Sequence, residues 1–127
     1  YALGEEIART IYKPVMNSHR CNVEQMAILE PVLPETILGT CLMMLREATD
    51  EAVRRGVPEA AARDFILGHM RVELAIAFQE KEGACFSDGA LKAIERAKPV
   101  LFQPDWKRVF EPEAIAESVR HITDPNS

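Results

Sequence analysis

A carboxylate beside a proline is the first candidate for chemistry. Glu30 stands between Leu29 and Pro31, just before the most apolar stretch of the chain. Apolar surroundings disfavour the charged form of a carboxyl group, which suits it to act as a general base or to anchor a substrate. Alternatively, Glu30 only interacts favourably with the N-terminus of the helix that follows. The sequence leaves both interpretations open.

A second candidate is the stretch Ser87-Asp88-Gly89, which is typical of the start of a helix. Backbone N–H groups at such a start can hold a carboxylate or a phosphate, and Lys92 follows one turn later. The plainer interpretation is that Ser87 or Asp88 caps the helix. We therefore treat Ser87, Asp88, Gly89 and Lys92 as candidates for substrate binding.

His69 and Glu73 lie four residues apart in a predicted helix, so both side chains are expected on one face. They could act as acid and base, form an ion pair or line a substrate cleft. A metal site would need a third ligand such as His19, because zinc takes at least three protein ligands. We therefore predict a substrate-lining role for His69 and Glu73, and no metal.

Thr36 and Thr40 also lie one turn apart, and their hydroxyls could face a ligand. Hydroxyls in helices more often bond back to a main-chain carbonyl, and this is the interpretation that we favour for both. The sequence contains no Gly-rich dinucleotide fingerprint, P-loop, HExxH or GxSxG motif. An enzyme built on this chain would therefore work together with another part.

Composition narrows the class of protein. The chain has 127 residues, 47% of them hydrophobic, and a net charge of −5, which fits one folded domain and argues against binding of nucleic acid. Its three cysteines are widely spaced without a CxxC pair, as is typical of reduced thiols in the cytoplasm. No apolar run reaches about 18 residues, so no membrane span is predicted.

Hydrophobic periodicity predicts a mostly helical chain that contains two long helices. Helices are expected over residues 3–12, 23–30, 35–55, 58–81, 90–98 and 113–122, with a helical turn near 106–109 and one weak strand over 15–23. Pro31 and Pro34 should kink or break the chain between the second and third helices. A single strand leaves its backbone groups unpaired, so it should belong to a sheet that these residues do not contain.

The first half of the 35–55 helix is apolar nearly all round. Such a helix is buried on several sides, and the other predicted helices are too short to cover it. We therefore expect a second chain to pack against it, most simply in a symmetric homodimer.

Four stretches of this sequence together resemble the C-terminal domain of bacterial NAD-binding phosphogluconate dehydrogenase-like proteins. The resemblance rests on residues 24–31 (EQMAILEP), 46–58 (REA through RRGVP), 68–75 (GH through VELA) and 86–94 (FSDGALKAI). It implies that residues 1–23 are the last helix and strand of an upstream Rossmann domain. Residues 24–127 would then be the helical C-terminal domain, which binds substrate and forms the dimer.

The resemblance further implies an NAD(P)-dependent oxidoreductase that acts on a sugar acid or a related hydroxy acid. NAD or NADP would be bound by the upstream domain, so this chain alone is expected to be inactive. The catalytic lysine of the family is missing at the start of the long helix, and Glu30 is the replacement that we predict. The Ser87-Asp88-Gly89 loop lies where related reductases hold the substrate carboxylate. The alternative from another class is a stand-alone helical homodimer that acts as an interaction module.

Overall fold

The computed structural model describes residues 1–124, and within them it contains helices but no strand. The mostly helical prediction is therefore confirmed. The elements in chain order are α1 (Ala2–Ile11), α2 (Val23–Ala27), η1 (Ile28–Gly39), α3 (Thr40–Arg54), α4 (Glu59–Ala77), α5 (Asp88–Leu101), η2 (Trp106–Phe110) and α6 (Pro112–Thr123).

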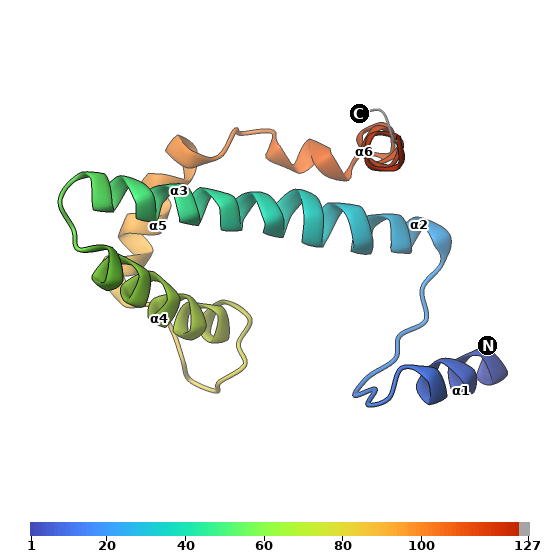
Figure 1. The fold of residues 1–127 in the computed structure, drawn as a ribbon. Helices are drawn as coiled ribbons and strands as arrows, with labels where there is room; N and C mark the ends of the chain where they lie inside the picture. The colour runs from blue at the N-terminus through green and yellow to red at the C-terminus, as the bar shows by residue number, and fades with distance from the viewer. Residues whose placement is uncertain (125–127) are drawn as a thin grey trace.

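The spine of the molecule is one continuous helix, Val23–Arg54, made of α2, η1 and α3 (Figure 1). Its 32 residues span about 48 Å. A capping box begins it: the Asn22 side chain accepts from the Gln25 N–H at 2.8 Å, and the Gln25 side chain accepts from the Asn22 N–H at 2.9 Å. Gly56 ends it with φ of 100°, a conformation that glycine adopts without strain.

Of the predicted kink or break at Pro31 and Pro34, the break is wrong. Both prolines lie inside η1, where the helix widens to π-type turns and continues into α3. Proline lacks an N–H and its ring collides with a carbonyl of an ordinary α-turn. In a π-type turn the backbone hydrogen bond joins residues five apart instead of four, so the helix continues through the two prolines.

The continuous helix also bears on the expectation that no segment spans a membrane. By length and composition alone, Val23–Arg54 is long and apolar enough to cross one, with a mean hydropathy of 1.5 in an 18-residue window. The sequence expectation counted uninterrupted apolar residues, whereas this window is apolar on average and can hold up to two charged residues. Core helices of water-soluble proteins pass the same test, so the observation by itself assigns no membrane.

Helix α4 follows α3 after a tight turn and packs against it. It ends at Ala77, earlier than predicted, because Gln79 adopts φ of 54° and reverses the chain before Gly83. The Glu80 N–H then bonds the Ala75 carbonyl at 2.9 Å, which satisfies one of the last carbonyls of the helix.

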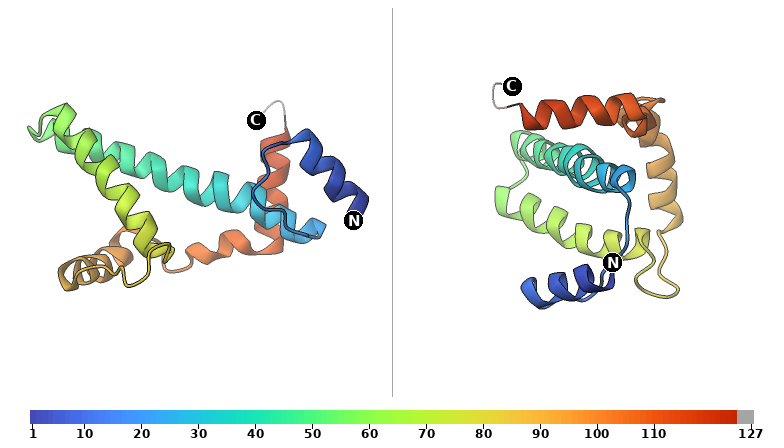
Figure 2. Two further views of the ribbon diagram at one scale, coloured as in Figure 1. Left: turned by 90° about the horizontal axis from the view of Figure 1, so that it is seen from below. Right: turned by 90° about the vertical axis from the view of Figure 1, so that its right-hand side faces the viewer.

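The C-terminal part returns along the spine (Figures 1 and 2), where η2 and α6 both pack against η1. Helix α5 runs through Pro99 to Leu101 instead of ending at the proline, since the fixed φ of proline fits a helix and only one hydrogen bond is lost. The predicted turn at η2 and the start of α6 at Pro112 are confirmed.

The strand predicted over residues 15–23 is not formed. Residues 14–22 carry no regular structure beyond a bend at Pro14, because the described part of the chain holds no second strand to pair with. The helix predicted before them is present as α1, which stands apart from the spine at the end of this connector (Figure 1). Its apolar side chains Leu3, Ile7 and Ile11 are 70%, 50% and 68% exposed.

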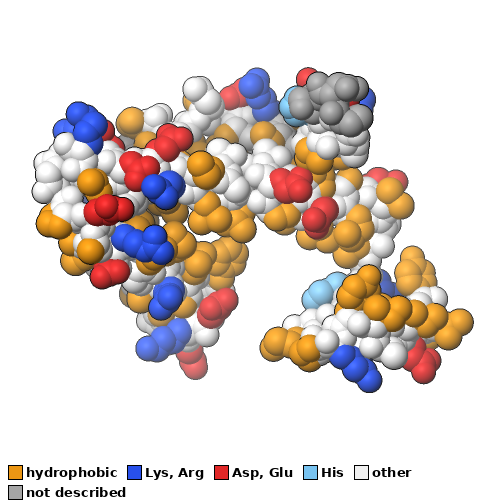
Figure 3. Space-filling view, viewed as in Figure 1, with side chains coloured by type: hydrophobic (Ala, Val, Ile, Leu, Met, Phe, Trp, Pro, Cys, Tyr) orange, Lys and Arg blue, Asp and Glu red, His pale blue; other side chains and the backbone are white. Residues whose placement is uncertain are grey.

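Little of the chain is buried. Within residues 1–124, only Pro31, Val32 and Ala62 are buried. Figure 3 shows hydrophobic side chains over α1 and along the spine on the molecular surface. The solvent-accessible surface is 11201 Å², against about 6,800 Å² for a compact protein of this mass. These residues therefore present apolar surface that a folded protein normally covers.

Candidate functional site

Glu30 lies on η1 at the point where the spine widens, and its side chain is exposed. The next two residues, Pro31 and Val32, are buried, and Val32 is only 1% exposed. The backbone of Glu30 is therefore held by its buried neighbours, while its carboxylate is exposed to solvent. The described residues do not provide the apolar enclosure that the sequence suggested.

The Thr36 hydroxyl donates to the Pro31 carbonyl at 2.9 Å. This confirms that the side chain bonds back to the main chain, as expected, but it does so across five residues instead of four. The bond spans the wide turn immediately after Glu30. The bond is partly buried.

At the N-terminus of α5, Ser87 acts as the helix cap. Its side chain accepts from the Ala90 N–H at 3.2 Å, which confirms the plainer interpretation of this loop. Asp88 lies in the first turn, where a negative charge is favoured by the helix dipole. Lys92 borders a shallow hollow together with Arg96. The four residues predicted here to bind substrate, Ser87, Asp88, Gly89 and Lys92, are all exposed.

His69 and Glu73 share one face of α4, as predicted, and both border a hollow of about 640 Å³ between α3 and α4. The imidazole Nδ1 lies 2.8 Å from the Phe65 carbonyl and the ring stacks on Phe65 at 5.2 Å between centroids. A carbonyl can only accept, so Nδ1 carries the proton and Nε2 is the acceptor in the neutral ring. The walls of the hollow are mainly apolar.

The structure does not gather the predicted residues into one site. Glu30 lies near the α2 end of the spine, whereas α4 and the start of α5 lie toward the opposite end (Figure 1). η1 packs against α6 and η2, while α4 packs against α3. Within one described chain, Glu30 and the Ser87 loop are therefore separate features.

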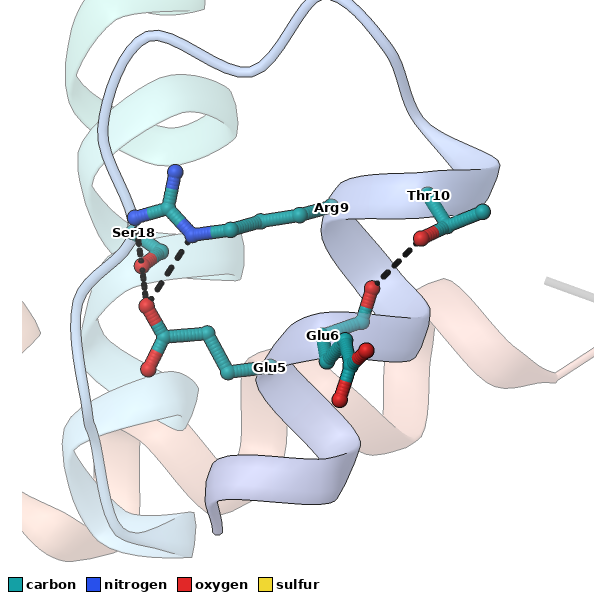
Figure 4. Close-up of polar contacts among 5 residues, drawn as sticks. All are labelled: Glu5, Glu6, Arg9, Thr10 and Ser18. Atoms are coloured by element: carbon teal, nitrogen blue, oxygen red, sulfur yellow. Dashed lines mark hydrogen bonds and ion pairs between the residues drawn. The ribbon is translucent and has the colours of Figure 1, made fainter.

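Sequence analysis missed a polar cluster between α1 and the connector (Figure 4). Ser18 donates to Glu5 at 2.6 Å, and Arg9 contacts both, at 3.0 Å to Glu5 and 2.7 Å to Ser18. The hydrogen bond from Ser18, followed by that from Arg9, lowers the pKa of Glu5. The spacing of Glu5 and Arg9 was a usable signal, but the contribution of Ser18 required the fold. His19 is exposed and borders the adjoining cavity of about 460 Å³.

The described residues bring no three His, Cys, Asp or Glu side chains together as candidate metal ligands. The alternative metal set of His19, His69 and Glu73 is thus not assembled in residues 1–124. The same residues contain no strand, and hence no strand–turn–helix unit of the kind that holds a dinucleotide. They do not fit NAD as its main binding site.

Comparison with known proteins gives the family. Residues 1–123 match the family model described as phosphogluconate dehydrogenase (decarboxylating), C-terminal. The chain is 58% identical over 123 residues to D-apionate oxidoisomerase of Rhizobium rhizogenes and 56% identical to the enzyme of that name from Cupriavidus necator. In both cases the match covers 97% of this chain and 44% of the relative.

A solved structure supports the same assignment. It is a semialdehyde dehydrogenase NAD-binding protein from Cupriavidus necator, in complex with calcium and NAD, and it superposes with a TM-score of 0.91 at 56% identity. The match covers 96% of this chain and 44% of that one. The resemblance inferred from the sequence is confirmed, and this chain belongs to the phosphogluconate dehydrogenase C-terminal domain family of NAD-dependent oxidoreductase-like proteins.

Proposed function

We propose that these residues are the substrate-binding and dimerisation domain of an NAD(P)-dependent enzyme that acts on D-apionate or a closely related sugar acid. The observation that carries this proposal is the 58% identity, over 97% of the chain, to a D-apionate oxidoisomerase. The chain spans about 44% of the length of such relatives. The dinucleotide would be held by a domain outside these residues, and this chain alone would be inactive.

The uncovered surface supports a role in assembly. A chain that exposes about 4,400 Å² more than a compact protein of its mass needs partners that cover it. We propose two such partners, a Rossmann domain of the same polypeptide and a second copy of the protein. Residues 1–23 would pack with the first partner. The dimer would form through the spine.

Within the assembled enzyme, we propose that Glu30 accepts the proton of the substrate hydroxyl that is oxidised. The Ser87-Asp88-Gly89 turn and Lys92 would bind the substrate carboxylate, with His69 and Glu73 lining the cleft. Glu30 and the Ser87 turn are separate in one chain, so the cleft would be completed by the covering domain or by the second copy. The three cysteines, free in the structure, fit a cytoplasmic enzyme.

The direct test uses the full-length protein with D-apionate and either NAD or NADP, followed by absorbance of the reduced cofactor and by identification of the product. Formation of reduced cofactor with D-apionate supports the proposal, and the product shows whether isomerisation accompanies oxidation. No reduction with D-apionate or with a panel of four- to six-carbon sugar acids would refute it. Light scattering on the same sample tests the dimer.

The role of Glu30 is tested by Glu30→Gln, which keeps the shape but removes the basic carboxylate. We expect kcat to fall at least a hundredfold, as is typical when a general base is lost. Glu35→Gln is the matched control, because Glu35 is an exposed carboxylate on the same element. If the Glu30→Gln enzyme keeps full turnover, Glu30 is not the base.

A further inference from the structure

Two prolines constrain the backbone at Glu30. Pro31 follows it directly, and a residue before proline is disfavoured in the α-helical conformation. Pro34 lies four residues after it, so in an ordinary α-turn its ring would collide with the Glu30 carbonyl. Both constraints meet at the residue that we propose as the base. The conformation of this turn therefore decides where the Glu30 carboxylate points.

The structure resolves the conflict with a wide turn that Thr36 reinforces. In π-type turns, residues five apart are paired, and the Thr36 hydroxyl bonds the Pro31 carbonyl across that same interval, at 2.9 Å. Other threonine hydroxyls bond the carbonyl four residues earlier, as Thr10 does to Glu6 and Thr49 to Leu45, each at 2.8 Å. The bond of Thr36 is thus fitted to the wide turn and not to a regular helix.

Packing holds one side of this turn in place. Pro31 and Val32 are buried in η1, and α6 and η2 pack against η1. Glu30 is exposed. Any relaxation of the turn would therefore move the free side, which carries the Glu30 carboxylate, more than the packed side.

We propose that Thr36 is a positioning residue for Glu30. By holding the Pro31 carbonyl, its hydroxyl keeps the wide turn in register and fixes the direction of the Glu30 carboxylate. This inference rests on the proposed function only where it concerns catalysis. The effect on the turn itself is independent of any substrate.

The test compares Thr36→Val with Thr36→Ser in the full-length protein. Valine keeps the shape and loses the hydroxyl, while serine keeps the hydroxyl. We expect Thr36→Val to lower kcat roughly two- to tenfold, the range that corresponds to the net contribution of one hydrogen bond, with KM unchanged. Thr36→Ser should restore kcat. Thr10→Val is the control, since it removes a hydroxyl bond to a carbonyl four residues earlier, in α1 and away from the proposed cleft, and should leave kcat unchanged.

Combining Thr36→Val with Glu30→Gln separates positioning from general damage. If Thr36 acts through Glu30, the double variant is no slower than Glu30→Gln alone. Independent multiplication of the two losses would overturn the proposal, as would unchanged kcat in Thr36→Val or an equal loss in Thr10→Val. A fully active Glu30→Gln would refute the base assignment and the catalytic part of this proposal, while wild-type turnover still supports the proposed function.

Hydrogen exchange gives a readout that needs no substrate. Amides of residues 31–41 should exchange faster in Thr36→Val than in wild type or in Thr36→Ser, and Thr10→Val should not change them. Equal exchange in all four proteins would overturn the proposal even if no substrate were found.

Discussion

We expect the fold of these 127 residues to depend on partners that cover their apolar surface. The perturbation is to express residues 1–127 alone. Within residues 1–124, only Pro31, Val32 and Ala62 are buried. A protein whose helices share so few buried contacts has little to hold them together, because most helical stability in proteins comes from packing.

The size of the deficit follows from the exposed area. The surface of 11201 Å² exceeds that of a compact protein of this mass by about 4,400 Å². If somewhat over half of the excess is apolar, about 2,500 Å² remains in water. At about 25 cal/mol per Å², this corresponds to roughly 60 kcal/mol of missing burial. Since folded proteins are stable by only about 5–15 kcal/mol, the isolated monomer cannot hold this arrangement.

Circular dichroism and light scattering on the isolated chain test this reasoning. We expect native-like helix content only in samples whose mass exceeds 14.2 kDa, and a melting temperature that rises with protein concentration, because association then supplies the missing burial. A 14.2 kDa monomer with a sharp melting transition that does not depend on concentration would refute it.

Two further predictions concern stability, measured by urea denaturation of the full-length protein. Gly56→Ala should lower the free energy of unfolding by about 1 kcal/mol or more, because φ is 100° at this position. Gly68→Ala should raise it by about 0.5–1 kcal/mol, because Gly68 lies inside α4 and no heavy atom lies within 4 Å of the new Cβ. Equal effects of the two substitutions would contradict the backbone conformations described for these glycines. Hydrogen bonds from Arg54, and next from Arg55, lower the pKa of Glu51, so its stabilisation is present above the ordinary carboxyl pKa and is lost as the pH falls through the lowered value. Glu51→Gln should therefore be less stable than wild type at pH 7 but not at pH 2, and a difference that does not change with pH would contradict this.

Local signals could be predicted from the sequence where neighbouring residues decide them. The cap at Asn22, the cap at Ser87 and the stop at Gly56 all act within about one turn of helix, and all three are present. The same local rules failed at Pro31 and Pro34. A proline forbids one hydrogen bond but does not decide whether the helix stops or widens, and here packing of α6 and η2 on η1 accompanies the wide turn.

The sequence by itself determined the helical class, most helix boundaries, and the family through its motifs. Only the tertiary structure decided that α2, η1 and α3 form one spine, that residues 14–22 form no strand within the described chain, and that Glu30 and the Ser87 turn lie apart. The physical reason is the distance along the chain over which each interaction acts. Caps and periodicity depend on residues within a few positions, whereas pairing, burial and the assembly of a site depend on surfaces brought together from distant parts of the chain or from partners.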